Sequence, residues 1–398
     1  MFPDGWELKR IGDIATVFTG GTPSRSAPEY WLNGDIPWAR TTEVQNCVIR
    51  EGDIKQRITQ QGLAKSSARM AHAGTILIAL IGQGKTRGQV ALLTTDAAIN
   101  QNCAAICLNK NHSPAFFFNY LLSQYQRIRG LSNSAGQSNL NGSTIQSLRV
   151  PVPPLVEQSK IASILVVSDR AIDKTHELVE KTIMQKKAVM QRLLTGKRRL
   201  PGFSGEWSSH KLGELFTERV ETARHDLPLL SITAKKGVIN RDDVGRKDSS
   251  NEDKSKYRRI CPGDIGYNTM RMWQGVSALS SLEGIVSPAY TIVVPRDGID
   301  AEFMSYLFQL PRTIHDFYRY SQGLTSDTWN LKFRHFKEVS VRVPGLQEQQ
   351  AIAAFLNRCD KQTDFYGQLR DLLSEEKKAL MQQLLTGKRR VKVDKAAA

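Results

Sequence analysis

The chain has 398 residues, of which 40% are hydrophobic and 24% charged, a composition typical of a soluble globular protein with two or three domains. No apolar run is long enough to span a bilayer and no secretory leader stands at the start, so a cytoplasmic location is expected. The five cysteines lack metal-ligand spacing, which predicts reduced thiols and no zinc site. The net charge of +16 favours a polyanionic partner.

The first motif along the chain that suggests chemistry is "ALIGQGKT", residues 79–86. It follows a strand-like run at 75–78, and a strand, a Gly-rich turn and Gly-Lys-Thr are the parts of a phosphate-binding loop in their usual order. Ala79, however, stands where the first glycine of that motif belongs. A nucleotide-dependent enzyme built on Lys85 is therefore one hypothesis that the sequence raises.

The second half of the chain repeats the first. "LLTGKRRL" at 193–200 returns as "LLTGKRRV" at 384–391, and the offset of 191 residues holds without a gap back to Val152 and Val343. About half of the positions in this stretch are identical, whereas the segments before it correspond only loosely. The order is thus a variable domain, a repeated segment, a second variable domain and a second repeated segment.

Each repeated segment is predicted to form one long helix, because apolar residues recur at spacings of three and four from 155 to 199 and again from 346 to 390. Gly196 and Gly387 are expected to stop the helices. A single helix with one apolar stripe is not stable alone, so we expect the two to pair as an antiparallel coiled coil with pseudo-two-fold symmetry. The alternative is that each helix packs on its own domain.

The repeat also tests the phosphate-loop hypothesis. Residues 262–279 align with 73–93 as a strand, a short turn and a second strand, but the second copy contains no Gly-Lys-Ser/Thr. A β-like run, 90–93, follows Thr86 where a phosphate loop should open a helix. Both observations favour a hairpin with a variable tip over an ATP site.

The predicted fold class is α+β, with two mixed α/β domains separated by two long helices. The domain boundaries that we expect are 1–153 for the first variable domain, 154–199 for the first spacer helix, 200–344 for the second variable domain, 345–391 for the second spacer helix and 392–398 for a tail.

The whole arrangement resembles the specificity subunits of type I restriction-modification systems. The resemblance rests on the duplicated helix ending in "LLTGKRR", on the opening "GWELKRIGDI" (5–14) followed by "FTGGTPS" (18–24), on "GDIPW" (34–38) and on "VSPAY" (286–290). It implies that each variable domain is a target recognition domain that reads one half of a bipartite, asymmetric DNA site, and that the helices set the gap. It also implies no catalytic site or cofactor in this chain.

The same resemblance implies the partners. These are double-stranded DNA, two modification subunits that methylate adenine with S-adenosylmethionine, and restriction subunits that use ATP and Mg²⁺. Consistent with a non-catalytic chain, the sequence has no Asp/Asn-Pro-Pro-Tyr/Phe motif for holding a flipped adenine. By resemblance only, the polar positions near the helix starts, Glu157, Gln158, Glu348 and Gln349, are the expected docking surface for the modification subunits.

Candidate DNA-binding residues come mainly from turns and polar runs whose amide, hydroxyl and guanidinium groups suit base edges and phosphates. "KSKYRRI" (254–260) adds an aromatic residue for stacking. In the first domain the candidates are Thr22, Ser24, Arg40, Thr41, Lys65, Ser66, Arg69, Gln83, Lys85, Arg87 and Gln137. In the second they are Thr233, Lys235, Lys236, Lys256, Tyr257, Arg258, Arg259, Asn268, Arg271, Trp273, Ser326 and Trp329.

Each candidate also has a plainer interpretation. The tips can be ordinary solvated turns, "KSKYRRI" a solvated strand edge, and the two Lys-Arg-Arg clusters helix caps that favour cations. Trp6 and Trp207 occupy equivalent positions and are expected to be core anchors. At the level of the whole protein, the alternative to sequence recognition is a coiled-coil scaffold that binds DNA without reading it.

Overall fold

The computed structural model describes residues 3–82, 84–131, 139–233, 236–245, 253–325 and 328–392. Contacts divide the chain into two compact units. Unit 1 comprises the residues up to His176 together with those from Gln368 onward, and unit 2 is Glu177–Gly367. Each unit holds one variable domain and a part of each long helix, while the five-segment division expected from the sequence remains a prediction.

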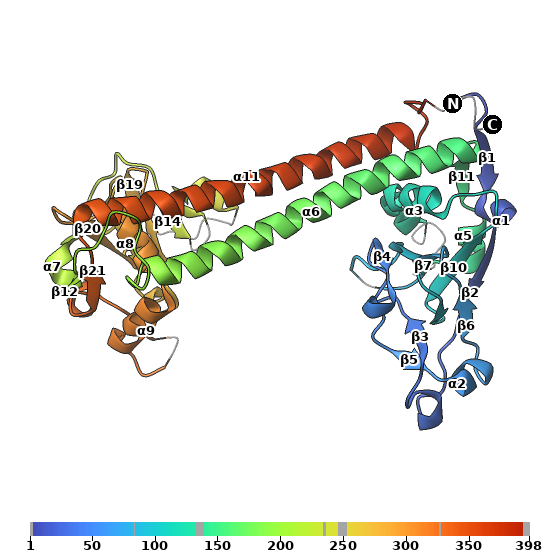
Figure 1. Cartoon of the computed structure of the whole chain (residues 1–398), viewed down its shortest axis with the longest axis horizontal. Helices are drawn as coiled ribbons and strands as arrows, with labels where there is room; N and C mark the ends of the chain where they lie inside the picture. Colours follow the sequence, from blue (N-terminus) through green and yellow to red (C-terminus); the bar gives the residue numbers. More distant parts are fainter. Residues whose placement is uncertain are drawn as a thin grey trace. The chain divides into compact units, whose positions relative to one another are not determined.

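The described part of unit 1 is built on two sheets and a ladder (Figure 1). One sheet has the order β2-β10-β7-β8-β4, the other β5-β3-β9-β6, and β1 pairs with β11. The strands are β1 (Glu7–Arg10), β2 (Ala15–Thr19), β3 (Ile36–Ala39), β4 (Cys47–Ile49), β5 (Arg57–Ile58), β6 (Arg69–Ala71), β7 (Ile76–Ala79), β8 (Val90–Leu93), β9 (Ala97–Ile99), β10 (Cys103–Leu108) and β11 (Arg149–Val152). The helices are α1 (Ile11–Ile14), η1 (Pro28–Tyr30), η2 (Glu51–Asp53), α2 (Gln60–Ala64), α3 (Pro114–Ser123), α4 (Tyr125–Gly130) and α5 (Gly142–Gln146).

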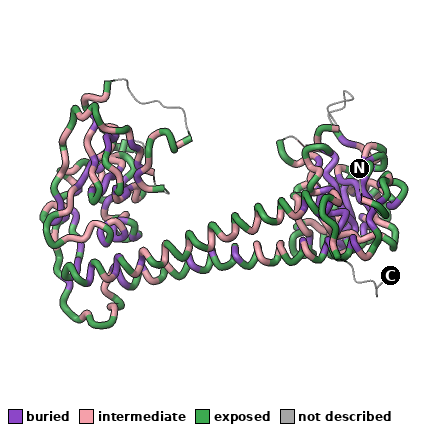
Figure 2. Tube along the Cα trace, turned by 90° about the horizontal axis from the view of Figure 1, so that it is seen from above, coloured by how far each residue is buried: buried purple, intermediate pink, exposed green. Residues whose placement is uncertain are grey.

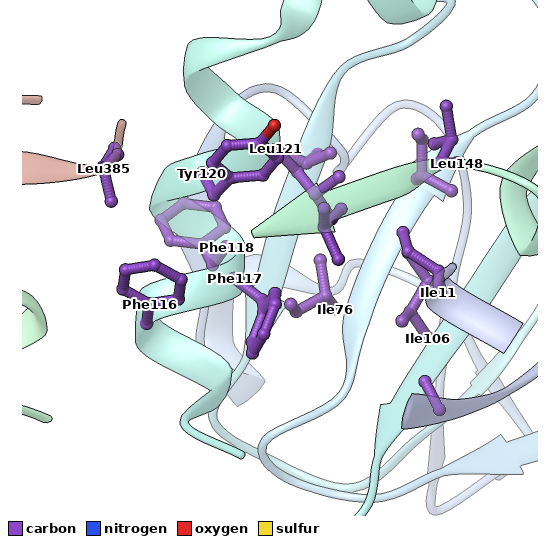
Figure 3. Packing of buried hydrophobic residues seen from close by; sticks show 14 of the residues in the cluster. Ile11, Ile76, Ile106, Phe116, Phe117, Phe118, Tyr120, Leu121, Leu148 and Leu385 are labelled. Atoms are coloured by element: carbon purple, nitrogen blue, oxygen red, sulfur yellow. The ribbon is translucent and has the colours of Figure 1, made fainter. Parts of the chain in front are cut away.

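Helix α3 supplies the aromatic side of the unit 1 core. It begins at a clear signal, since the Ser113 hydroxyl accepts a hydrogen bond from a first-turn N–H and proline occupies the first helical position. Phe116 and Phe117 are fully buried and pack in one cluster with Ile76 of β7 and Leu385 (Figure 3). Burying a side chain of this size stabilises the fold by about 2–3 kcal/mol. The end of the second long helix is therefore fixed to the first variable domain.

Unit 2 repeats this plan with fewer strands among its described residues. Its sheet has the order β13-β20-β17-β18, with three two-stranded ladders, β12-β21, β14-β15 and β16-β19. The strands are β12 (Ser208–Lys211), β13 (Phe216–Arg219), β14 (Leu230–Thr233), β15 (Gly237–Asn240), β16 (Arg258–Ile260), β17 (Ile265–Asn268), β18 (Ser277–Leu279), β19 (Gly284–Val286), β20 (Tyr290–Pro295) and β21 (Ser340–Val343). The helices are α7 (Leu212–Leu215), η3 (Arg241–Val244), η4 (Met272–Gln274), α8 (Ala301–Leu307), α9 (Pro311–Tyr320) and α10 (Phe333–Phe336).

The segment that suggested a phosphate loop is a β-hairpin. β7 pairs antiparallel with β8, with Ile76 opposite Leu92 and Ile78 opposite Val90. β17 and β18 form the equivalent hairpin in unit 2. Because the turn of "ALIGQGKT" leads into a strand and not into a helix, it lacks the helix N-terminus on which a phosphate loop depends. The hairpin interpretation is confirmed.

The two long helices are α6 (Leu155–Leu193) and α11 (Leu346–Leu384), each of 39 residues and about 60 Å long. In unit 1, Lys377 Nζ lies 2.5 Å from the Asp169 carboxylate, and in unit 2, Lys186 Nζ lies 2.5 Å from that of Asp360. Within each unit the start of one helix thus lies beside the end of the other, and buried and exposed residues alternate along both (Figure 2). The predicted fold class and antiparallel pairing are confirmed. No helix among the described residues is apolar enough over a sufficient length to cross a membrane.

In each unit a bidentate ion pair joins the two helices, and we call it the clasp. In unit 2, Arg199 Nε and Nη2 each lie 2.5 Å from a carboxylate oxygen of Glu348. In unit 1, Arg390 makes the same bidentate pair with Glu157, which also accepts a hydrogen bond of 3.1 Å from Trp6 Nε1. The glycine just after each helix has a positive φ, 70° at position 196 and 74° at position 387, and so performs the predicted stop.

Candidate nucleic-acid interface

The hairpin tip of unit 2 brings together predicted residues from two distant segments. Thr269 O accepts a hydrogen bond of 2.8 Å from Leu331 N, which ties the tip to the segment that follows α9. The rings of Trp273 and Trp329 meet edge to face with centroids 5.1 Å apart, and Tyr318 packs on Trp329 at 4.9 Å. These contacts form a half-exposed aromatic cluster. Its indole and phenol faces suit stacking against bases or sugars.

The two segments that form this cluster also carry exposed cations. Arg271 is exposed at the tip and has no ion-pair partner among the described residues, and Asn268 is half-buried beside it. Lys332 and Arg334, also exposed, lie within five residues after Trp329 and line a cleft that Thr269 of the tip also lines. The other lining residues of the cleft are Glu218, Arg258, Thr269, Pro288, Thr291 and Phe333. Lys332 and Arg334 were not among the residues predicted from the sequence, although the basic residues of "NLKFRH" (330–335) could have indicated them.

The hairpin tip of unit 1 is also held by a later segment of its unit, helix α4. Tyr125 Oη of α4 donates a hydrogen bond of 2.6 Å to Lys85 O, and Arg129 Nη1 donates one of 2.9 Å to Tyr125 Oη. The Lys85 side chain is exposed and that of Arg87 is half-buried. In each unit a later segment thus holds the hairpin tip, whereas the side chains at the tips differ. The candidates Gln83, Gln137, Lys235 and Ser326 lie outside the described residues.

A second group of unit 1 candidates lies apart from the tip, around the loop after β2. Thr22 Oγ1 donates a hydrogen bond of 2.6 Å to Gln101 Oε1, and the Ser24 and Ser26 hydroxyls are 2.8 Å apart. The Arg69 guanidinium lies over the Phe18 ring at 4.2 Å. Such contacts hold the side chains in place while leaving Ser24 and Arg69 exposed.

The remaining candidates of this group differ in what they can offer a ligand. Lys65 is exposed, Thr41 is half-buried, and the Ser66 hydroxyl accepts a hydrogen bond from Ala68 N. Arg40 is paired with Glu43 at 2.9 Å and is half-buried, so its charge is already neutralised.

The structure gives most of "KSKYRRI" an internal role. Tyr257 is only 4% exposed and cannot stack on a base from that position. Arg258 pairs with Glu218 at 2.6 Å, and Arg259 bridges Glu221 and Glu283. The hydrogen bond from Arg259 also lowers the pKa of the Glu221 carboxyl. The expected stacking role of Tyr257 is therefore corrected to core packing. Arg258 and Arg259 form ion pairs within the domain, but 26% and 25% of their side chains stay exposed, and their contact with phosphates remains a prediction.

Three other candidates of the second domain stand on turns. Lys256 and Lys236 are exposed. Thr233 Oγ1 accepts a hydrogen bond from Lys236 N and donates one to Gly237 O, so its hydroxyl closes the β14-β15 hairpin. Of the three, the two lysines are the ones available to a phosphate.

The expected docking residues at the helix starts are buried, with 1–5% of each residue exposed. Glu157 and Glu348 belong to the clasps. Gln158 donates to Pro153 O and accepts from Ser113 N, and Gln349 bonds to Pro344 O and Asp300 N in the same way. They connect each helix to its variable domain, so the expectation of an exposed docking surface at these four positions was wrong.

Three comparisons with known proteins agree with this architecture. Residues 3–182 match the family model described as the type I restriction modification DNA specificity domain. The MjaIX specificity subunit of Methanocaldococcus jannaschii is 31% identical over 194 residues, which are 46% of this chain and 43% of that protein. The alignment to the EcoR124I/EcoR124II specificity subunit of Escherichia coli covers 40% of that protein, so the chain spans less than half the length of both relatives. The putative MjaX specificity subunit of M. jannaschii is 23% identical over 98% of this chain and 95% of its own length.

Solved structures show the same fold over the whole length. The S subunit of a type I restriction-modification system from M. genitalium has a TM-score of 0.58 at 16% identity and covers 96% of both chains. The HsdS subunit of Thermoanaerobacter tengcongensis has a TM-score of 0.53 and covers 98% of both. These findings show that residues 3–182 are similar to the type I restriction modification DNA specificity domain, and that the whole chain has the fold of these solved subunits.

Proposed function

We propose that this chain is the DNA-sequence specificity subunit of a type I restriction-modification complex. Each variable domain reads one half of a bipartite, asymmetric site, and the paired helices set the spacing between the halves. The chain itself performs no catalysis. It directs adenine methylation, and restriction where restriction subunits are present, by partners that bind S-adenosylmethionine, ATP and Mg²⁺. The complex acts on double-stranded DNA in the cytoplasm.

One observation carries the proposal: the two units share one fold, but the side chains on their equivalent hairpin tips differ. Unit 1 presents Lys85 on a hairpin supported by α4, and unit 2 presents Arg271 and Trp273 on a hairpin packed against α9. A scaffold without readout needs no difference at these places. Two domains that recognise different half-sites need different side chains at these tips, because base-edge contacts specify sequence while phosphate contacts supply affinity.

The proposal is tested by mapping adenine methylation in a host that carries this chain, its modification subunit and no other methyltransferase. We expect two short sequence blocks around a fixed run of unspecified bases, and loss of the pattern when the gene is deleted. Unchanged methylation, or methylation in one continuous block, would exclude two-domain reading and favour the scaffold hypothesis.

Arg271→Ala is expected to weaken binding of the complete methyltransferase complex to its mapped site about tenfold, because one guanidinium contact to DNA is lost. Fluorescence anisotropy at several salt concentrations measures this loss, and a reduced salt slope would assign the contact to a phosphate. Arg296→Ala is the matched control, because Arg296 is exposed at the opposite end of β20 from the tip. Equal losses in both variants would remove the tip from the interface.

A further inference from the structure

Arg25 stands in the loop that follows β2 and is held over an aromatic ring. Its guanidinium carbon lies 3.7 Å from the centroid of the Trp31 ring, and its Nη2 donates a hydrogen bond of 2.9 Å to Gln56 Oε1. A guanidinium at this distance is attracted by the negative face of an indole, and the contact uses none of its N–H groups. Arg25 is exposed and has no ion-pair partner among the described residues. A positioned set of donors, with its charge uncompensated, is therefore presented at the surface of unit 1.

Two indole groups fix the loop that carries Arg25. Trp31 Nε1 donates a hydrogen bond of 2.9 Å to Ser24 O, and Trp38 Nε1 donates one of 3.0 Å to Gly21 O. The two rings meet edge to face with centroids 5.2 Å apart, and Trp38, which belongs to β3, is only 2% exposed. Because backbone and side chain are both held before a ligand arrives, binding through Arg25 costs little conformational entropy.

The equivalent loop of unit 2 also carries an arginine, but there the side chain is engaged within the domain. This loop follows β13, which occupies the place of β2 at the edge of its sheet. Arg224 donates to both carboxylate oxygens of Asp226, at 2.9 and 2.8 Å, and to the Glu221 carboxylate at 3.1 Å. All three nitrogens of Arg224 have a carboxylate partner, whereas Arg25 has one amide oxygen. The comparison shows that the arginine of unit 1 is the one with donors to offer.

The surroundings of Arg25 suit a nucleic acid. The turn at residues 65–69 packs on the same loop, since a β-carbon added to Gly21 would lie 1.9 Å from Ser67 Oγ. Lys65 and Arg69 of this turn are exposed, which places further cations beside the loop. A phosphate requires little more than positive charge, whereas a base edge must be met in one orientation. The anchored loop and the held guanidinium provide one orientation, and two parallel N–H groups of an arginine match O6 and N7 of guanine.

We propose that Arg25 is a specificity-determining residue of the first variable domain, and that its guanidinium reads a guanine through O6 and N7. Trp31 and Gln56 are positioning residues that hold the guanidinium for this contact. Lys65 and Arg69 supply neighbouring phosphate contacts. This inference rests on the proposed function and adds to it a residue, which the sequence did not single out, and the base that this residue recognises.

The test combines a change in the arginine with a change in the base. The full-length chain is assembled with its modification subunit, the methylated motif is mapped, and binding to that site is measured by fluorescence anisotropy. Arg25→Met keeps an apolar cover on Trp31 but removes every donor. We expect it to relax one guanine position in one half-site and to weaken binding about ten- to hundredfold. Replacing that guanine by 7-deazaguanine, which lacks the N7 acceptor, is expected to weaken binding of the unaltered complex about tenfold and that of the Arg25→Met complex by less than about twofold.

Arg224→Met is the matched control, because Arg224 stands in the equivalent loop and is already paired with Asp226 and Glu221. It is expected to leave both half-sites of the motif unchanged, and thermal unfolding checks that each variant is folded.

An unchanged motif in the Arg25→Met complex overturns the inference. So does a uniform loss of affinity for all sequences with a salt slope lower by about one, which would make Arg25 a phosphate contact. If the unaltered complex methylates one continuous site, the proposed two-part reading fails, whereas the loss of one guanine from that site in the Arg25→Met complex still supports the role of Arg25.

Discussion

Arg199→Ala is expected to destabilise unit 2 by about 3 kcal/mol. Only 5% of the Glu348 side chain is exposed, and removing the guanidinium leaves its carboxylate buried without the bidentate partner. An uncompensated buried charge is among the costliest single defects in a folded protein. Urea denaturation followed by circular dichroism measures the change in the free energy of unfolding.

Two companion variants separate the buried charge from general damage. Arg198→Ala removes the adjacent exposed cation and is expected to change stability by less than about 0.5 kcal/mol. Arg199→Leu combined with Glu348→Leu removes both charges together and is expected to recover much of the loss, since an apolar pair can replace a buried ion pair. If Arg199→Ala and the Arg199→Leu/Glu348→Leu double variant are equally unstable, the clasp stabilises unit 2 by the packing of its side chains and not by its charges.

Gly20→Ala is expected to destabilise unit 1 by about 3 kcal/mol or more. A β-carbon at position 20 would lie 1.8 Å from the Ile99 carbonyl oxygen and 2.5 Å from its carbon. The obstacle is backbone of β9, so the loop after β2 must move away from the sheet, and overpacking of this kind costs a few kcal/mol. A lowered midpoint of thermal unfolding is the readout.

Gly52→Ala is the matched control for this substitution. Gly52 lies in the same domain, has a negative φ and has no atom within 4 Å of an added β-carbon. Alanine there is expected to be neutral or slightly stabilising, because it restricts the unfolded chain. A Gly20→Ala protein as stable as the control would mean that the loop after β2 is free to shift.

The helices and hairpins could be predicted because the internal repeat allows the two halves of the chain to be compared with each other. The second copy of the hairpin lacks the Gly-Lys-Thr of the first, and the ungapped offset placed both helix starts correctly. The helices end at Leu193 and Leu384, before the positions 199 and 390 that the apolar spacing predicted. The clasp could not be predicted, since nothing in the local letters says that Glu157 meets a residue more than two hundred positions away. A polar pair at a helix start suggests an exposed surface, and only the tertiary partners make its burial tolerable.

The same limit explains why the ion pairs of "KSKYRRI" were not expected. Its arginines looked available for phosphates because their carboxylate partners come from separate segments, at Glu218, Glu221 and Glu283. By contrast, Arg271 and Trp273 stand at a tip whose position follows from the hairpin itself. The exposure of a charged side chain in a turn is thus predictable from sequence. On a strand, whether a charged side chain is paired depends on the neighbouring segments that the sheet brings beside it.

The paired clasps have a consequence for how such a protein changes over generations. Each variable domain is bounded by the same few attachment points, a tryptophan at its start and a Glu-Gln pair just beyond its last strand. A domain from a related protein that has the same tryptophan and Glu-Gln pair would contact the same clasp arginine, Arg390 or Arg199, as the domain that it replaces. Exchange of sequence within the repeated segments can therefore replace a whole domain without rebuilding a core, and under the proposed function this would change one half of the recognised site in one event.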